Sequence, residues 1–404
     1  MRKILNNTIF RLLLGVILGL ILGGYLNDTG LQIILSTRHI LGQLILFLVP
    51  LIILGFVVSS ITKLNKDSVK IISFSVLIAY LSSIGAGFFS STLGYKLIPK
   101  LEIASTTKEL NEIPTMLFTL DIPPVFGVMT ALTLALMLGI GILWTESKPL
   151  EQAFDQFKDI VLLLVNRVLI PILPFYIMSN FALLSYEGSI QSQLPIFLTV
   201  ILIVILAHFV WLTVLYTLAG IYSKKNPWEV LKHYGPAYLT AVGTMSSAAT
   251  LGVALHSAHK SKVLNPSITN FTIPFFSNIH LCGSVLTEVF FVMTVSQVLY
   301  GSLPDLGTMI LFILLLGIFA VGAPGVPGGT VMASLGIITS VLGFDDAGIA
   351  LTLTIFALQD SFGTACNITG DGALSLMVTK FSESSKSKDD SKDQSEADIY
   401  PTSK

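Results

Sequence analysis

Long runs of apolar residues, each closed by a short polar or charged stretch, organise the first half of the chain. Runs long enough to cross a bilayer as a helix, about 17–25 residues or longer if tilted, occur at 9–26, 38–62, 69–97, 115–145, 159–185 and 194–223. This pattern predicts six transmembrane helices in the first 223 residues.

Two later apolar segments are interrupted near their centres. Residues 234–262 break at the sequence MSSAA, and residues 305–345 break at GAPGVPGG, where two prolines and four glycines cannot continue a helix. Non-helical backbone at membrane depth is tolerated only inside protein or beside a cavity. Both segments are therefore predicted to be re-entrant helical hairpins. Each precedes a full span, at 266–300 and 351–380, and this repetition in opposite orientation is the inverted-repeat layout of secondary transporters.

Composition supports this pattern. Of 404 residues, 53% are hydrophobic and only 12% are charged, and the mean hydropathy is +0.81. These values predict a polytopic membrane protein, and the apolar runs make it all-α, with eight transmembrane helices plus two re-entrant hairpins. A net charge of -1 gives no indication of nucleic-acid binding.

The distribution of lysine predicts the orientation. Loops near Lys66 and Lys224 are rich in lysine, which places them and both termini in the cytoplasm by the positive-inside rule. Four basic residues then fall outside and oppose this assignment: Arg38, Lys96, Lys100 and Lys108. The predicted location is the plasma membrane, as a multi-pass protein in contact with lipid.

A polar stripe interrupts the last apolar run. Asp360, Thr364, Asn367 and Asp371 are spaced by four, three and four residues, so all four share one helical face. An ionised carboxylate inside a membrane costs several kcal/mol unless it meets a partner, an ion or water. The stripe predicts a site for a small polar solute or a cation. The alternative is that neighbouring helices satisfy both carboxylates structurally.

Four motifs resemble those of the dicarboxylate/amino acid:cation symporters, the family of the glutamate transporters. They are TMSSAATLGVAL, IPFFSNIHLCGS, GAPGVPGG and the final-helix pattern D-x-x-x-T-x-x-N-x-x-x-D. The resemblance implies an elevator-type transporter and a homotrimer. Residues 1–223 would be mainly scaffold, with the third span joining the transport domain. Residues 224–380 would form that domain as hairpin 1 (227–262), helix 7 (264–300), hairpin 2 (305–345) and helix 8 (346–380), followed by a disordered cytoplasmic tail at 381–404.

The resemblance also implies a substrate site. Asp360 would bind the substrate ammonium, and the hydroxyls and amides of the first hairpin tip would face the substrate carboxylate. The whole implied set is Ser246, Ser247, Ser284, Val326, Gly328, Asp360, Gly363, Thr364 and Asn367.

Sodium is the coupling ion that the resemblance implies. Asp371 would supply the one side-chain carboxylate, and backbone oxygens would complete two sites, because hard cations take oxygen ligands. The implied ligand set is Phe276, Asn278, His280, Ala320, Val321, Ala323, Asn367 and Asp371.

Two departures from the family pattern change the expectation. Acidic-substrate members carry an arginine three residues after the first aspartate of the final helix, where this chain has Gly363. A substrate side-chain carboxylate would then lack a partner, and its burial would be costly. The LQDS-x-x-T-A-x-N pattern instead resembles the serine/threonine:sodium branch. His280 and Cys282 replace the usual asparagine and aspartate, which predicts fewer than three sodium ions and leaves a proton-carrying role for His280 open.

The leading interpretation is a sodium-coupled importer of serine, threonine or a similar small neutral amino acid. The alternative is a proton- or sodium-coupled carrier of dicarboxylates or acidic amino acids. An enzyme is not expected, since Asp360 and Asp371 lie about 16 Å apart along one helix and no Ser/His/Asp arrangement is apparent. The sequence leaves the roles of Arg167 and Glu288 open, as snorkelling or paired side chains.

Overall fold

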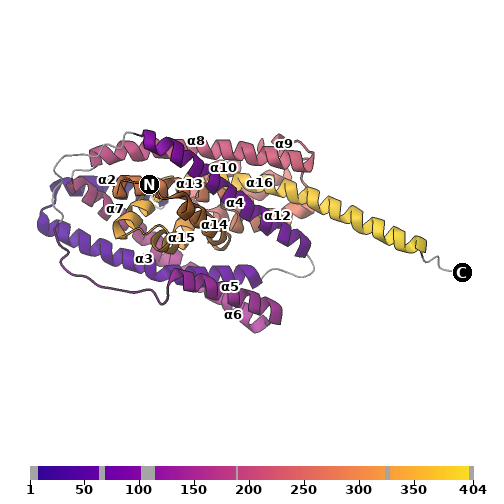
Figure 1. Cartoon of the computed structure of the whole chain (residues 1–404), viewed down its shortest axis with the longest axis horizontal. Helices are drawn as coiled ribbons and strands as arrows, with labels where there is room; N and C mark the ends of the chain where they lie inside the picture. Colours follow the sequence, from indigo (N-terminus) through magenta and orange to yellow (C-terminus); the bar gives the residue numbers. More distant parts are fainter. Residues whose placement is uncertain (1–7, 63–68, 102–113, 188–189, 324–327, 400–404) are drawn as a thin grey trace.

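The computed structural model describes residues 8–62, 69–101, 114–187, 190–323 and 328–399, and these residues form helices without any strand. Figure 1 shows them as one bundle, from which the last helix projects. The principal helices are α2 (Thr8–Tyr25), α3 (Asp28–Thr62), α4 (Val69–Leu97), α5 (Val128–Thr145), α6 (Lys148–Leu164), α7 (Ile170–Glu187), α8 (Ile190–Ser223), α9 (Trp228–Leu231), α10 (Gly235–Thr244), α11 (Ser247–His259), α12 (Pro266–Ile279), α13 (Cys282–Tyr300), α14 (Leu306–Gly322), α15 (Gly329–Ser340) and α16 (Asp346–Ile399).

Helices α13 and α16 form the centre of the bundle. Every residue of α13 from Cys282 to Ser296 is buried. Helix α13 contacts α4, α14 and α15, while α16 contacts α8, α10, α12 and α13. The most apolar part of 266–300 is 100% buried and that of 195–223 only 39%, so the outer helices present apolar surface outward. Figure 1 shows α8 along one side of the bundle and α3 with α5 along the other.

Four helical stretches among the described residues are long and apolar enough to cross a membrane. They are Lys70–Lys100, Pro195–Ser223, Pro266–Tyr300 and Asp346–Ser384. Shorter apolar helices such as Leu306–Gly322 and Gly329–Ser340 accompany them. Several long apolar helices in an all-helical chain fit the predicted polytopic membrane protein. How each helix lies relative to a bilayer stays a prediction.

Both segments predicted to break do so in the structure. Helix α10 ends at Thr244, the next residue Met245 takes a left-handed conformation with φ 53°, and α11 begins after Ser246. Helix α14 ends at Gly322 and α15 begins at Gly329, after Gly328 with φ 71°. A positive φ costs little for glycine and explains its use at that helix start. Each pair of helices is in mutual contact.

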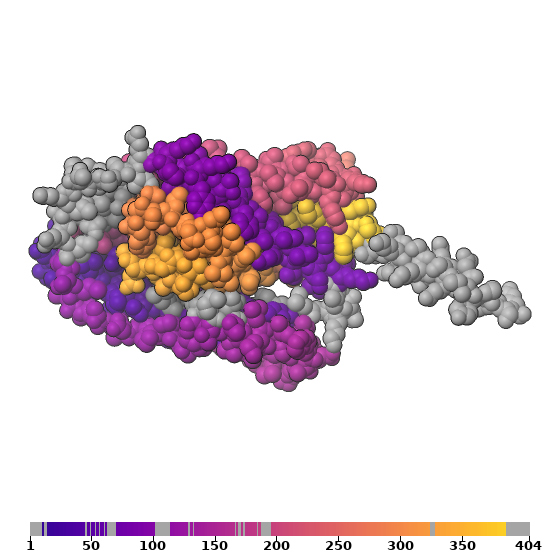
Figure 2. All heavy atoms as spheres, in the orientation of Figure 1, coloured from indigo at the N-terminus to yellow at the C-terminus, as the bar shows by residue number. Residues whose placement is uncertain are grey.

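Helix α14 also lies at the surface. Its residues Leu306, Ile310, Leu311 and Leu314 are exposed. In Figure 2 the orange atoms of this region form part of the outer face, between the purple atoms of α4 and the magenta atoms of α5. One face of α14 therefore lies on the outside of the bundle, whereas most of α15 and the adjoining part of α13 are buried.

Three predicted boundaries differ from the structure. The expected span 115–145 is helical only from Val128, because Pro123 and Pro124 lie in the non-helical segment 114–127. The single span 266–300 is divided into α12 and α13 at His280 and Leu281. The tail predicted to be disordered from 381 is helical to Ile399, since no glycine or proline interrupts it before Pro401.

The early helices pack mainly on one another. Helix α2 packs against α7, and α3 packs against α5 and α6. Helices α4 and α8 differ, because the principal contacts of α4 are with α13 and α14, and those of α8 are with α16. This placement of the third apolar run beside the later helices is what the predicted domain division requires. The division itself stays a proposal.

Candidate functional site

The polar face of α16 is buried in the bundle. Asp360, Thr364, Asn367 and Asp371 expose 3%, 5%, 2% and 0% of their surface, respectively. Helix α16 contacts both helices of the first broken pair, both α12 and α13, and α15. The stripe predicted from the sequence therefore faces protein, at the level where three helices are interrupted.

Asp360 meets the start of α15. The backbone N–H of Gly328 donates to Asp360 Oδ2 at 2.7 Å. Gly328 is the residue that precedes the first turn of α15, where backbone N–H groups have no partner within the helix. Thr364 lies one turn further along the same face of α16 and is also buried. The structure thus brings together three predicted substrate residues; Val326 lies outside the described residues.

Asn367 caps α13 from another helix. Its Oδ1 accepts from the N–H groups of Gly283 (2.7 Å) and Ser284 (3.2 Å), and its Nδ2 donates to Ser284 Oγ (2.9 Å). These two N–H groups are the second and third of α13, and Leu281, the residue at the helix start, provides no side-chain cap. The amide of Asn367 therefore does what a helix-capping side chain ordinarily does.

Asp371 pairs with His280. Asp371 Oδ1 lies 2.8 Å from His280 Nδ1, and His280 Nε2 lies 2.9 Å from Ser82 Oγ on α4. Both His280 and Asp371 are fully buried, and Asp371 Oδ2 has no hydrogen-bond partner among the described residues. The structure thus contains a Ser82–His280–Asp371 chain of polar contacts, which was not apparent from the sequence because Ser82 and His280 are 198 positions apart. Through these contacts, His280 joins the break between α12 and α13 to α4 and to α16.

Gly363 faces α13 without a charged neighbour. A Cβ built on it would lie 3.4 Å from Thr287 Oγ1 and 3.5 Å from Ser284 Cα. The buried polar residues that the structure describes include Asp, Glu, Asn, Gln, His, Ser and Thr, but no lysine or arginine. Within those residues, nothing replaces the guanidinium that the family pattern would place at this position.

The first hairpin tip presents one serine that is engaged and one that is open. Ser246 Oγ accepts from the N–H of Ala249 at 3.3 Å, so Ser246 caps α11. Thr250 donates to the carbonyl of Ser246 at 2.9 Å. Ser247 is 2% exposed, and no hydrogen bond joins its hydroxyl to another described residue. Ser247 is thus the tip residue with a hydroxyl available for a ligand.

The predicted cation ligands divide into two groups. Phe276 is buried, and its carbonyl accepts from the N–H of His280 at 2.8 Å. The exposed Asn278 donates from Nδ2 to the carbonyl of Pro274 at 2.7 Å. Ala320, Val321 and Ala323 lie at the end of α14, where the Ala320 carbonyl accepts a long hydrogen bond from the N–H of Ala323 at 3.4 Å. No group of three His, Cys, Asp or Glu side chains suited to a transition metal occurs in the described part. The available oxygens suit a hard cation.

Some buried polar residues were missed or left open by sequence reasoning. The Ser334 hydroxyl on α15 donates to Glu288 Oε1 on α13. The other oxygen of this carboxyl, Oε2, has no partner among the described residues. Glu288 is therefore a core carboxyl with one of its two oxygens hydrogen-bonded. Gln359 is fully buried, and neither amide atom has a described partner. Arg167 is exposed instead, within a short π-helical stretch. The signal for Gln359 was its place beside Asp360 in an apolar run.

Known proteins resemble this chain over most of its length. Residues 8–381 match the profile of the sodium:dicarboxylate symporter family. Excitatory amino acid transporter 1 of Ambystoma tigrinum is 26% identical over 290 residues, which cover 68% of this chain and 53% of that protein. The putative sodium-dependent excitatory amino acid transporter glt-4 of Caenorhabditis elegans is 23% identical over 307 residues, covering 73% and 59%. The human excitatory amino acid transporter 1 is 26% identical over 235 residues, covering 57% and 43%. The chain spans about half the length of these relatives.

Proposed function

The chain belongs to the sodium:dicarboxylate symporter family, a family of membrane transporters rather than enzymes, and from this premise we propose that it imports a small neutral amino acid together with sodium. Serine and threonine are the substrates proposed, in keeping with the LQDS-x-x-T-A-x-N pattern of Leu358 to Asn367. The protein would work as a multi-pass transporter of the plasma membrane, with both termini in the cytoplasm.

The absence of a buried cation carries the choice of a neutral substrate. The described core contains Asp360 and Asp371 but no lysine or arginine, and Gly363 stands beside Ser284 and Thr287. A substrate with a second carboxylate would bury that charge against neutral hydroxyls, and an unpaired buried charge is strongly destabilising. A neutral amino acid carries one carboxylate and one ammonium. Asp360 would take the ammonium by a charge-assisted hydrogen bond.

Helix ends and hydroxyls would bind the rest of the substrate. The start of α11, with the open hydroxyl of Ser247, provides donors for the substrate carboxylate. Thr364 and Ser284 provide further hydroxyls on the neighbouring α16 and α13. Substrate bound to Asp360 would compete with the N–H of Gly328, and binding would therefore act on the position of α15. A ligand shifts such an equilibrium only through its different affinity for the two states.

Sodium would bind near Asp371 as the transported partner. Asp371 Oδ2 is without a described partner and is fully buried, which makes it a strong oxygen ligand for a cation. Carbonyl oxygens near Phe276, His280 and Asn367 would complete this site. A second sodium would use carbonyls near Asn278, Ala320, Val321 and Ala323. Because His280 already occupies Asp371 Oδ1, we propose one or two sodium ions rather than three.

The movement and assembly are part of the same proposal. Eight helices would cross the membrane, and the pairs α10/α11 and α14/α15 would enter it as re-entrant hairpins. The transport domain would be residues 224–380 with α4, and it would move against the remaining helices of a homotrimer. The buried α13 and α16 and the contacts of α4 with α13 and α14 support this division.

Substrate-dependent thermal stabilisation tests the proposed function directly. Binding to the folded state raises apparent stability by mass action, by about 2.7 kcal/mol at a ligand concentration of 100 Kd. We expect the purified protein to be stabilised by serine or threonine in Na⁺, and not in K⁺ or choline. Asp371→Asn should abolish sodium-dependent uptake into proteoliposomes. Stabilisation by aspartate alone, or full sodium stimulation in Asp371→Asn, would contradict the proposal.

A carrier of acidic amino acids or dicarboxylates, coupled to protons or sodium, is the second candidate. Its support is that the relatives are excitatory amino acid transporters by name, and that the family name includes dicarboxylates. Competition of labelled serine by aspartate and succinate separates the two. If aspartate or succinate displaces labelled serine at concentrations as low as unlabelled serine does, the second candidate is favoured.

A further inference from the structure

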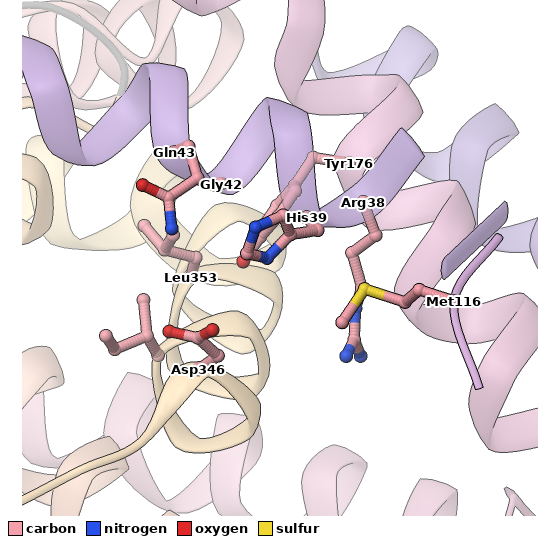
Figure 3. Close-up of a pocket in the computed structure, with 9 residues that line it drawn as sticks. Arg38, His39, Gly42, Gln43, Met116, Tyr176, Asp346 and Leu353 are labelled. Atoms are coloured by element: carbon pink, nitrogen blue, oxygen red, sulfur yellow. The ribbon is translucent and has the colours of Figure 1, made fainter. Parts of the chain in front are cut away.

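A cavity lies at the start of α16, away from the polar face that carries Asp360 and Asp371. It is formed between α3, α7 and the first turns of α16, and Met116 of the non-helical segment 114–127 lines one side. Figure 3 shows the side chains of Arg38, Tyr176 and Asp346 around this space. Its volume is about 60 Å³, several times the roughly 10–15 Å³ that one water molecule requires. The cavity can therefore hold a small organic molecule or a group of waters.

The cavity has one charge of each sign and a partly apolar floor. Arg38 comes from α3 and Asp346 from the start of α16, and neither makes a salt bridge with any residue of the described ranges. Asp346 is exposed, whereas Tyr176 (3%) and Leu353 (3%) are buried, so the cavity runs from a wet rim to a buried base. Opposite charges that line one space without pairing leave both free for a ligand.

The segment 114–127 holds this arrangement in place. His39 Nε2 lies 3.2 Å from Asp121 Oδ1, and the Leu117 N–H donates to Ser36 Oγ at 3.0 Å. Both contacts tie the segment to α3, on the same stretch of helix that carries Arg38. Because His39 is engaged by Asp121, the cation of the cavity with no such partner is Arg38.

We propose that this cavity is a second binding site for an amino acid zwitterion. The Arg38 guanidinium binds the α-carboxylate through paired N–H donors, and the Asp346 carboxylate binds the ammonium. Gln43 supplies an amide at the same wall, and Ile349 and Leu353 offer apolar surface to the carbon atoms of the ligand. A simple anion or cation would satisfy only one of the two charges. The choice of an amino acid rests on the proposed function.

The second site is distinct from the first and lies on the same helix. Asp346 precedes Asp360 by 14 residues, which is about 21 Å along α16. A ligand bound between Arg38 and Asp346 bridges α16 to α3. The bound ligand therefore resists any movement of α16 against α3. A high concentration of amino acid would fill this site and inhibit transport.

Counting bound serine tests the proposal on the full-length purified protein. We measure labelled serine by equilibrium dialysis in Na⁺ for the wild type and for Asp360→Asn, which weakens the first site but keeps an acceptor for Gly328. Two sites in the wild type and one in Asp360→Asn are expected. Adding Arg38→Gln or Asp346→Asn to that variant should weaken the remaining site at least tenfold, whereas Lys100→Gln, an exposed charge outside the cavity, should not.

A charge exchange separates binding from folding. In the Asp360→Asn background, the double substitution Arg38→Asp with Asp346→Arg restores one charge of each sign. It should recover the serine binding that is lost when only Arg38 or only Asp346 is substituted. One site in the wild type and none in Asp360→Asn would overturn the second site and leave the proposed function standing. No serine binding in the wild type would overturn both. Binding in Asp360→Asn that is unchanged by the Arg38 and Asp346 substitutions would place the second site elsewhere and overturn this one.

Discussion

Asn367 should stabilise the protein even without substrate, because it caps a buried helix. Its Oδ1 accepts from the N–H groups of Gly283 and Ser284, at 2.7 and 3.2 Å. In Asn367→Ala both N–H groups stay buried without an acceptor, and each unsatisfied buried group costs about 1–3 kcal/mol. Removing an ordinary helix cap costs about 0.5–2 kcal/mol. We expect the free energy of unfolding to fall by about 2–4 kcal/mol, since contacts that act together are not additive.

Two measurements examine this expectation. The first is apparent melting temperature in the absence of amino acids, and the second is hydrogen–deuterium exchange at the start of α13. Asn367→Ala should lower the former and speed the latter at Gly283 and Ser284. The exposed Asn270, bonded to His259, gives a matched control in Asn270→Ala with little change.

One result would refute the capping argument. If Asn367→Ala binds no substrate but melts and exchanges like the wild type, the amide serves the ligand alone. Its contacts with Gly283 and Ser284 would then contribute nothing measurable to folding. A loss of stability confined to samples with substrate would lead to the same conclusion.

Three further expectations concern specificity, the core and pH. Gly363→Arg should weaken serine binding at least tenfold and admit aspartate, measured by competition; an unchanged preference would count against the role of Gly363. Ser334→Ala removes the donor to the buried Glu288 carboxyl and should lower the unfolding free energy by about 1–3 kcal/mol, checked by calorimetry; equal stability would show that the contact is dispensable. Thr308 lowers the pKa of Asp305 below its ordinary 3.8, through hydrogen bonds of its hydroxyl and amide. A lowered pKa means that the stabilisation is present above 3.8 and lost as the pH falls through the folded value; hydrogen exchange at the start of α14 should therefore accelerate in acid, and Asp305→Asn should remove that dependence.

Local chemistry allowed the breaks and the stripe to be predicted. The glycines and prolines of 322–329 exclude a continuous helix, and the spacing of Asp360 to Asp371 places four polar residues on one face, whatever surrounds them. The structure confirms the interruption at Gly322 and the burial of the stripe. Both predictions depend only on residues near one another in sequence.

What could not be predicted depends on distant partners. The break between α12 and α13 occurs at His280 and Leu281, neither of which is a helix breaker, and it is held by Asn367 and Asp371 from α16. Ser82 joins His280 across 198 positions. No periodicity within 266–300 carries this information, so the segment reads as one span. The same limit applies to Glu288, whose partner Ser334 lies on another helix.

The three polar contacts of α16 have a common physical basis that bears on coupling. Asp360 and Asn367 accept from helix starts at Gly328 and Gly283, and Asp371 pairs with His280 at the end of α12. Helix starts attract negative charge and helix ends attract positive charge. A zwitterion that enters at Asp360 and Asn367 therefore meets groups that already have partners, and its binding exchanges hydrogen bonds rather than adding them. A cation at Asp371 meets one partnered oxygen, Oδ1, and the Oδ2 that has no described partner. The net gain is then a small difference between similar terms, so substrate and sodium affinity must depend on where α13 and α15 lie. That dependence is what couples binding to movement.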